Sequence, residues 1–332
     1  MQQSVRAQDQ EDLAPNAETP RSASEAATSA TARVDRSVTD RSVTLPGIAR
    51  TREFVDDPGV RRPTAFERAQ LRGFERVAFA IAELCNAPPF KAVGQAFLAT
   101  VGRTWVRVLS QNLHRKRGLE HLPQSAPDRG VMLVANHSSF FDLYVVSSIL
   151  FHEVDWIKEL YFPVRSDFFY DRPLGVFVNG IMAAQSMYPP VLRQKERRLF
   201  NRFAIEFVID ALTKPGTVVG YHPEGTRNKT GDPYTMLKAQ PGVGEIAYHS
   251  RPLIIPVFIT GLGNDLPRQV RSNFDGTGTP IDVVFGKSPD LQRLYERPAG
   301  PETYQAIADA MRDEIMRLGE IQRAAPSLRV AS

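Results

Sequence analysis

The apolar run Val131–Ala135 leads into a polar turn and then into a second apolar stretch, Leu143–Leu150. Such a short apolar run before a turn is typical of a buried strand, whereas the second stretch with its flanks is long enough for a helix. Reactive side chains of α/β proteins often lie where a strand ends and a helix begins. The turn Asn136–Asp142 is therefore the first candidate functional segment.

Within this turn, His137 and Asp142 are five positions apart. Helical side chains face each other only at separations of three or four, so the two meet only if His137 lies in the turn and Asp142 in the first helical turn. The carboxylate would then hold one ring nitrogen and leave the other to accept a proton from a hydroxyl. The structural alternative is a capping box formed by Ser139 and Asp142.

A second polar turn, Tyr221–Arg227, follows another strand-like run at 216–220. A proline and a glycine interrupt the strand and expose backbone in a tight loop. The loop also carries a carboxylate, Glu224, and a guanidinium, Arg227, which is a good anion-binding group. Taken alone, the loop is best explained as a surface turn with a Glu–Arg pair.

Together the two turns resemble the glycerolipid acyltransferases, the 1-acylglycerol-3-phosphate acyltransferases and their lysophospholipid acyltransferase relatives. The family's first motif, Asn-His-x-x-x-x-Asp, is matched by Asn136, His137 and Asp142, and its third, Pro-Glu-Gly-Thr-Arg, by Pro223–Arg227. The resemblance covers about residues 70–320. Weaker matches to other family segments are Gly118–Pro123, Trp156–Leu160, Lys238 before Gly242, and Ile254–Val257.

The resemblance implies acyl transfer from a thioester, acyl-CoA or acyl carrier protein, to a lipid hydroxyl. His137 would be the general base, and Asp142 would orient it and stabilise its imidazolium. Backbone N–H groups around Gly225 would stabilise the oxyanion. No metal or redox cofactor is implied. The residues expected to bind the substrates are Asn136, Lys158, Glu224, Gly225, Thr226, Arg227 and Lys238.

The second family motif departs from the pattern. It usually ends in an arginine that is thought to bind the acceptor phosphate, whereas the corresponding run here, Gly180–Ser186, has none. The family's default acceptor is 1-acylglycerol-3-phosphate, and another lyso-lipid or hydroxylated lipid is the alternative. Candidates to replace the arginine, each also explained as a surface charge, are Arg165, Arg172, Arg193 and Lys195.

Two functions of other classes remain open. One is an inactive, membrane-associated lipid-binding protein on the same fold, although binding alone would not require a base and an orienting carboxylate. The other is a metal-dependent hydrolase using His137, Asp142 and a further histidine. The six histidines lack the His-x-x-x-His and His-Glu-x-x-His spacings that are common in such sites.

Composition limits the partners. The formal charge of +4 suits an anionic membrane surface or acyl donor, but no basic stripe with interleaved aromatics indicates nucleic acid binding. Cys85 is the only cysteine, so no intrachain disulfide can form. We find neither a signal peptide nor an apolar run long enough to span a bilayer, and so expect a peripheral protein at the cytoplasmic face of a membrane.

Four parts are expected along the chain. Residues 1–62 are polar with a single aromatic, Phe54, which predicts a disordered tract. Residues 63–117 have apolar side chains at helical spacing, with arginines off the stripe and a break at a proline pair. They predict an amphipathic helical hairpin that packs on the next domain or lies in a membrane interface. Residues 118–323 would form the acyltransferase domain and 324–332 a loose tail.

The acyltransferase domain alternates strand-like and helical segments, which predicts an α/β fold with a mostly parallel or mixed sheet flanked by helices. The expected strands are 131–135, about 154–158, about 180–184, 217–221, 254–259 and 281–285, and the expected helices are 142–152, about 193–213, about 243–250 and 302–323.

Overall fold

The computed structural model describes residues 61–192, 194 and 197–324. The described residues all fall within one compact unit, Pro58–Ser332. Almost all of the expected disordered tract and nearly all of the expected tail lie outside the described residues, as do Arg193 and Lys195.

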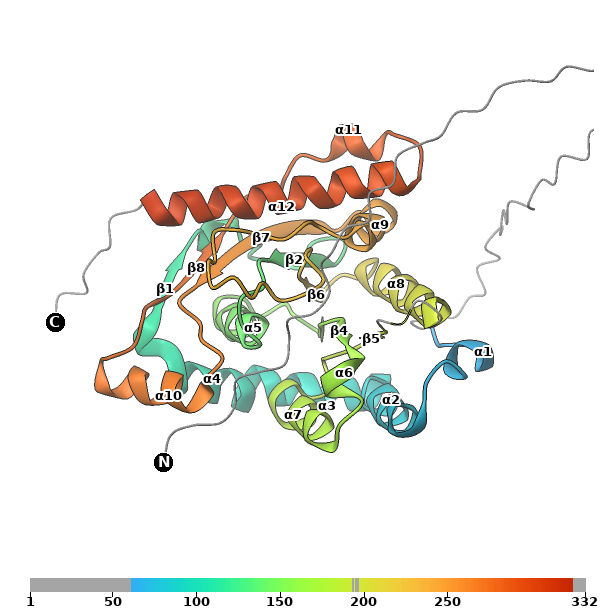
Figure 1. Ribbon diagram of the computed structural model, residues 1–332, viewed down its shortest axis with the longest axis horizontal. Coiled ribbons are helices and arrows are strands. Elements are labelled where there is room, and N and C mark those ends of the chain that lie inside the picture. The colour runs from blue at the N-terminus through green and yellow to red at the C-terminus, as the bar shows by residue number, and fades with distance from the viewer. Residues whose placement is uncertain (1–60, 193, 195–196, 325–332) are drawn as a thin grey trace, which may run out of the picture. The chain divides into compact units, whose positions relative to one another are not determined.

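A six-stranded sheet in the order β1-β8-β7-β2-β6-β3 forms the centre of the described unit (Figure 1). Every neighbouring pair is parallel except β7 and β8, so the predicted mostly parallel or mixed sheet is confirmed. The strands are β1 His114–Arg117, β2 Val131–Ala135, β3 Glu159–Tyr161, β6 Thr217–Tyr221, β7 Leu253–Thr260 and β8 Ile281–Phe285. A separate pair is formed by β4 Val164–Arg165 and β5 Pro190–Val191.

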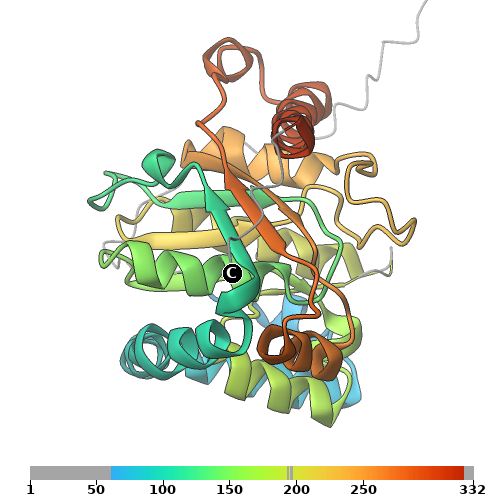
Figure 2. The same ribbon diagram turned by 90° about the vertical axis from the view of Figure 1, so that its left-hand side faces the viewer.

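Helices cover both faces of the sheet, which explains why all five residues of the central strand β2 are buried and apolar. In Figures 1 and 2, α9 (Pro241–Ser250) and α12 (Pro301–Ala324) lie on one face, and α5 (Asp142–Glu153) lies on the other. The helix α8 (Arg198–Leu212) packs against α9 and β6. The expected helices are therefore present, with shifted ends.

The N-terminal helices form a second layer outside α5. They are α1 Ala65–Arg68, α2 Gly73–Cys85, α3 Pro88–Phe97, a π-helical segment Leu98–Gly102, and α4 Arg103–Ser110. The helix α4 packs on α5, and the ammonium of Lys91 on α3 donates to the Leu160 carbonyl of β3 at 2.8 Å. The predicted hairpin thus packs on the acyltransferase domain. Its segment also reaches into the sheet, because its last residues form β1.

Four parts of the fold differ from the sequence-based expectation. The predicted strand at 180–184 lies mostly in α7 (Pro173–Ala183), because a short apolar run fits either element and Pro173 favours a helix start. The strand expected at about 154–158 is found at β3, a few residues later. The edge strand β1 reads His-Arg-Lys-Arg, and a charged edge strand gives no apolar signal. The polar helix α10 (Leu266–Asp275) was also not expected.

Candidate active site

Three parallel strands end at one edge of the sheet and bring the candidate residues together. Strand β6 lies between β2 and β3 and is parallel to both, so all three have their carboxyl ends on the same side. His137 is the second residue after β2, His222 directly follows β6, and Arg165 lies in β4, shortly after β3. The carboxyl edge of a parallel sheet is the usual location of binding and catalytic groups.

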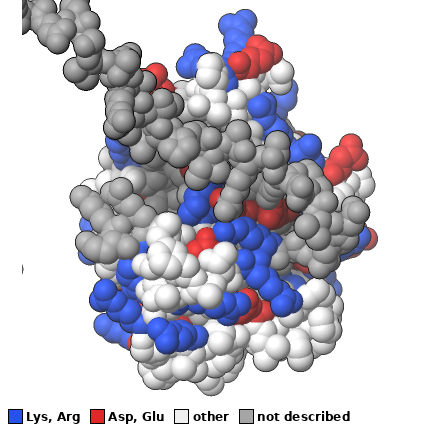
Figure 3. Space-filling view, turned by 90° about the vertical axis from the view of Figure 1, so that its right-hand side faces the viewer, with Lys and Arg blue, Asp and Glu red and all other residues white. Residues whose placement is uncertain are grey.

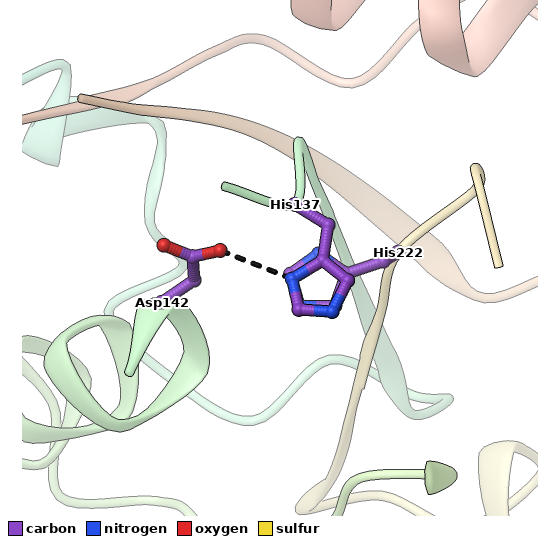
Figure 4. A group of neighbouring side chains, drawn as sticks. All are labelled: His137, Asp142 and His222. Atoms are coloured by element: carbon purple, nitrogen blue, oxygen red, sulfur yellow. Dashed lines mark hydrogen bonds and ion pairs between the residues drawn. The ribbon is translucent and has the colours of Figure 1, made fainter. Parts of the chain in front are cut away.

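His137 and Asp142 make the contact that their spacing predicted. Nδ1 of His137 lies 3.2 Å from Oδ2 of Asp142, which opens α5 (Figure 4). The same oxygen accepts the backbone N–H groups of Ser138 at 2.9 Å and Ser139 at 2.8 Å. The carboxylate is fully buried, whereas 20% of the His137 side chain is exposed, so a substrate can reach the imidazole but not the carboxylate.

The capping box that was the structural alternative does not form. The helix α5 begins at Asp142 itself, with Phe141 as its N-cap. The hydroxyl of Ser139 instead donates to the Gly263 carbonyl at 2.7 Å and accepts the Phe141 N–H at 3.2 Å. Ser139 therefore ties the turn to the loop after β7, and Asp142 is left to hold the imidazole.

Glu224 supports His137 from the second turn. Its Oε1 accepts the His137 N–H at 2.9 Å, and its Oε2 accepts the Leu237 N–H at 2.8 Å. The carbonyl of His137 accepts the Asn228 N–H at 2.8 Å. Both backbone polar groups of His137 are thus held by the loop that carries the third motif, which fixes the position of the imidazole.

His222 stacks on His137. The ring centroids are 3.9 Å apart and the planes differ by 9° (Figure 4). Nδ1 of His222 lies 3.0 Å from the Ala135 carbonyl, and because a carbonyl only accepts, this nitrogen carries the proton. In the sequence, His222 was weighed only as a possible metal ligand. The feature that identifies His222 as a neighbour of His137 is its position directly after β6, which runs parallel to the strand that precedes His137.

Burial sets the charge states of these groups. Burial lowers the pKa of His137 to about 4, and the nearby Arg227 and Arg165 charges act in the same direction. Burial lowers the pKa of His222 to about 3 and raises the pKa of Asp142 to about 6. At pH 7 the cluster therefore holds two neutral imidazoles and an ionised carboxylate.

His137, Asp142 and His222 are also close enough to be considered as metal ligands, since their ligand atoms all lie within 4.8 Å of one another. A histidine binds a metal through a lone pair that lies in the plane of its ring. The two rings are stacked 3.9 Å apart and almost parallel, so no single ion can lie in both planes. The geometry suits a base and its neighbours better than a metal site.

A polar cleft of about 400 Å³ opens beside Ser138, in the turn that carries His137. Ser138, Arg227 and Leu262 are among the residues that line it. Nη1 of Arg227 donates to Oδ1 of Asn264 at 2.8 Å, and the guanidinium lies 4.5 Å from the centroid of the Phe140 ring. Arg227 is therefore held in place at the mouth of the site, where it can meet an anionic ligand.

The other predicted substrate-binding residues are placed differently. The Asn136 amide exchanges two hydrogen bonds of 2.8 Å with the backbone of Ile259, which joins β2 to β7. The Gly225 N–H donates to the His222 carbonyl at 2.9 Å, so this group is already used and does not point to an oxyanion. Thr226 is half-buried in the same loop, and the exposed Lys238 directly follows Leu237, whose N–H binds Glu224.

Lys158 is a predicted substrate-binding residue that the structure places away from the cluster. It directly precedes β3, and its N–H donates to the Gly216 carbonyl just before β6. His137 and His222 follow the ends of parallel strands, so Lys158 lies at the opposite edge of the sheet.

The departure from the second motif is structural as well. Gly180–Ser186 comprises the end of α7 and a turn in which Ala184 and Gln185 have positive φ values. Ser186 is fully buried, and its hydroxyl lies 3.4 Å from the Lys91 ammonium. Arg172 is exposed at the start of α7. Among the described candidates, Arg165 is the one whose charge acts on the pKa of His137.

Comparisons with known proteins agree with this arrangement. Residues 114–260, which include both turns, match the family model described as Acyltransferase. The chain is 29% identical over 153 residues to a chloroplastic 1-acyl-sn-glycerol-3-phosphate acyltransferase of Arabidopsis thaliana, over 45% of this chain and 36% of that protein. It is 25% identical over 202 residues to a chloroplastic enzyme of the same name from Brassica napus, over 60% of this chain and 48% of that protein.

The chain thus spans less than half the length of each of these curated relatives. The crystal structure of the 1-acyl-sn-glycerophosphate acyltransferase PlsC from Thermotoga maritima aligns with a TM-score of 0.44 and 19% identity, over 79% of this chain and 88% of that one. The match of residues 114–260 contains the first and third motifs with their His137–Asp142 and Glu224 contacts. Residues 114–260 are thus identified as an Acyltransferase-family domain, and the chain is similar to 1-acyl-sn-glycerol-3-phosphate acyltransferases.

Proposed function

We propose that the protein transfers a fatty acyl group from an acyl thioester to a hydroxyl of a glycerolipid, with 1-acylglycerol-3-phosphate as the acceptor. The observation that carries this proposal is the contact of 3.2 Å between His137 Nδ1 and the buried Asp142 carboxylate, at the edge of an open polar cleft. The printed names of the two plant relatives support the choice of acceptor.

In the proposed reaction, Nε2 of His137 takes the proton from the acceptor hydroxyl as its oxygen attacks the thioester carbonyl. Asp142 holds the Nδ1 proton and stabilises the resulting imidazolium. The tetrahedral intermediate then collapses, the carbon–sulfur bond breaks, and the imidazolium returns its proton to the leaving thiolate. The products are an ester and a free thiol, and no acyl-enzyme forms because the acceptor is itself the nucleophile.

The acceptor phosphate is assigned to Arg227 and Arg165. They follow two different strands whose carboxyl ends share the edge of the sheet with His137. Both charges lower the pKa of His137, as expected of cations close to the imidazole. Two guanidinium groups close to the base can hold a phosphate while the neighbouring hydroxyl meets Nε2. This pair would replace the arginine that is missing from the second motif.

The part of the acyl chain next to the thioester carbonyl is assigned to a narrow apolar crevice of about 40 Å³ between α4 and α5. Trp105, Leu109, Phe141 and Tyr144 are among the residues that line it, and its lining is almost entirely apolar. Leu262 lines both this crevice and the polar cleft, and each hollow also touches the turn that carries His137, at Phe141 and at Ser138. A thioester carbonyl placed beside Leu262 would have its first acyl carbons in the crevice and its polar carrier in the cleft.

We further propose that the protein works on a membrane surface as a peripheral protein. None of the described helices is long and apolar enough to cross a bilayer. In Figure 3, side chains other than Lys, Arg, Asp and Glu gather along the lower edge of the described unit. A group of exposed apolar side chains on neighbouring helices is typical of an interaction site. Its exposed members on α2, α3 and α7 include Phe74, Val77, Ile81, Phe90, Val93, Leu174, Phe177 and Ile181.

The function is tested by following thiol release from a long-chain acyl-CoA, with products identified by mass spectrometry. The acceptors are glycerol 3-phosphate, 1-acylglycerol-3-phosphate, other lysophospholipids and a blank without acceptor. We expect release that depends on 1-acylglycerol-3-phosphate, and its loss in a folded His137→Gln variant. Release with only another lyso-lipid would keep the chemistry and change the acceptor.

If acyl-CoA gives no release, the same panel is repeated with acyl carrier protein as donor. Failure with both donors would contradict the enzymatic proposal and favour a lipid-binding protein on the same fold. Wild-type rates in a folded His137→Gln variant would contradict the assignment of the base.

A further inference from the structure

Resting on the proposed function, we assign a role to His222, a residue outside both family motifs whose ring stacks on His137. The third motif begins at Pro223, directly after His222. The two rings come from different strands, yet they lie face to face with centroids 3.9 Å apart and planes within 9° (Figure 4). Packing alone does not explain why two polar rings are stacked beside an open cleft.

The His222 ring is fixed by its own hydrogen bonds. Its Nδ1–H donates to the Ala135 carbonyl at 3.0 Å, at the end of β2. Its backbone carbonyl accepts the Gly225 N–H at 2.9 Å, which closes the turn. The plane of the His222 ring is therefore fixed by the sheet and by the loop. His137 lies against the face of this fixed ring.

The charged groups around the pair come from several elements. The Asp142 carboxylate faces it from α5, and the Arg165 guanidinium acts on it from β4. Glu224 and Arg227 approach from the loop that follows His222. Two imidazolium cations at this separation would repel each other strongly in a buried setting, so only one ring can be protonated. Burial keeps the His222 ring neutral, and the proton taken in the reaction therefore stays on His137.

A proton relay between the two rings does not fit this geometry. Ring protons and lone pairs of imidazole lie in the ring plane. Stacked rings present their π faces to each other, so no N–H of one ring points at a nitrogen of the other. The face of a neutral aromatic ring instead carries negative partial charge and attracts a cation placed over it.

We propose that His222 is a positioning residue for acyl transfer: its neutral ring fixes the plane of His137 and its π face stabilises the imidazolium that forms there. Asp142 then acts on the edge of the imidazolium and His222 on its face. His222 exchanges no proton during the cycle.

The test compares three substitutions in the full chain. His222→Phe keeps a flat π face without the ring nitrogens, His222→Leu keeps an apolar side chain without a π face, and His222→Gln keeps an N–H donor without a π face. For each we would measure kcat, both KM values, the pH profile of kcat/KM and the melting temperature. A separate measurement is the NMR titration of His137 in the resting protein.

With His222→Phe we expect kcat within about threefold of wild type, because a cation–π contact is retained. With His222→Leu and His222→Gln we expect kcat to fall about tenfold with little change in either KM, which matches the loss of a cation–π contact of about 1–2 kcal/mol. In these two variants the imidazolium of His137 loses a stabilising contact, so its titration moves to lower pH. The acidic limb of kcat/KM should move with it.

A His222→Leu variant with wild-type kcat and an unmoved His137 titration would overturn the proposal. Equal losses in the Phe and Leu variants would also overturn it, because the π face would then not be the cause. If His222→Leu fails to fold, the Phe and Gln pair gives the same comparison. The NMR titration needs no substrate, so it still tests the stack if the wild-type protein shows no acyl transfer and the proposed function fails.

Discussion

The backbone N–H of His137 donates to Oε1 of Glu224 at 2.9 Å, across 87 positions of sequence. The other carboxylate oxygen of Glu224 accepts the Leu237 N–H at 2.8 Å. Each oxygen of this buried glutamate thus holds a backbone group. The glutamate of the third motif therefore positions His137, the proposed base.

Replacing Glu224 by glutamine should separate this positioning role from substrate binding. An amide has one oxygen, so one of the two N–H groups would face an N–H donor instead of an acceptor, which costs about 1–3 kcal/mol. We expect kcat to fall at least about tenfold, the melting temperature to fall, and both KM values to change little. A matched control is Glu320→Gln on the exposed face of α12. A large rise in acceptor KM with kcat unchanged would show that Glu224 binds the acceptor instead.

Replacing Asp142 by asparagine should remove the preference for the Nδ1–H tautomer of His137. The asparagine amide can donate to Nδ1, which would then leave the proton on Nε2 and remove the base. We expect kcat to fall by about 10³–10⁴, as for the corresponding change in Ser-His-Asp triads, with the fold retained. The measurement is thiol release at saturating substrates, with circular dichroism as the folding control. A loss of less than about threefold would exclude Asp142 as the orienting group.

Arg165 and Arg227 are predicted to act on the phosphate of the acceptor. Changing either to glutamine should raise the KM for 1-acylglycerol-3-phosphate by about tenfold and leave the KM for the acyl donor nearly unchanged. Neither substitution should raise the KM for a monoacylglycerol acceptor, which has no phosphate. Arg172→Gln, at an exposed site just before α7, is the matched control. Equal rises in KM for both acceptors would mean that these two arginines do not bind the phosphate.

The apolar surface on α7 can be tested without removing a helix. Phe177 and Ile181 are 63% and 50% exposed, one helical turn apart. Their replacement by glutamate should weaken binding to vesicles of zwitterionic and anionic lipids at least about tenfold, since each buried apolar side chain contributes about 1.5–3 kcal/mol. Leu199→Glu, at an exposed leucine of α8, is the control. Unchanged vesicle sedimentation of the double variant would place the membrane contact elsewhere.

Deleting residues 64–113 would be a weaker test of the same surface. The helix α4 packs on α5, and Lys91 of α3 is buried against β3. The deletion would therefore expose the core as well as remove the apolar surface. A loss of vesicle binding could then not be attributed to the apolar surface.

The sequence predicted those parts of the fold and site that depend on local patterns. The apolar runs gave β2, β6, β7 and β8 within a few residues, and the separation of His137 and Asp142 allowed their contact if His137 lay in the turn and Asp142 in the first helical turn. The elements that it missed lack such a pattern. In α7 an apolar run fits both helix and strand, and β1 owes its place to pairing with β8 and not to apolar residues.

The roles that the sequence could not assign depend on long-range contacts. Asn136 was expected to bind substrate, but its amide is used by the backbone of Ile259, 123 positions away. Lys158 belongs to a family-like segment, yet the direction of β3 places it at the far edge of the sheet. His222 became visible as a neighbour of His137 only when the order of β2 and β6 in the sheet was known.

Lys91 links the N-terminal helices to the sheet and should make stability depend on pH. Its ammonium donates to Oδ1 of Asn86 and to the Leu160 carbonyl, both at 2.8 Å, and lies 4.0 Å from the centroid of the Tyr161 ring. Full burial lowers the pKa of Lys91 to about 7. In the unfolded chain this pKa is about 10.4.

Between pH 7 and 10 the unfolded chain therefore binds more protons at Lys91 than the folded protein does. The free energy of unfolding should rise with pH in this window, by at most about 1.4 kcal/mol per pH unit from this residue. The measurement is urea unfolding at pH 7, 8 and 9. Lys91→Met should remove this part of the slope even though it leaves the Leu160 carbonyl unpaired and lowers stability overall, whereas Lys287→Met at an exposed site should not. An equal slope in wild type and Lys91→Met would show that Lys91 stays charged in the folded protein.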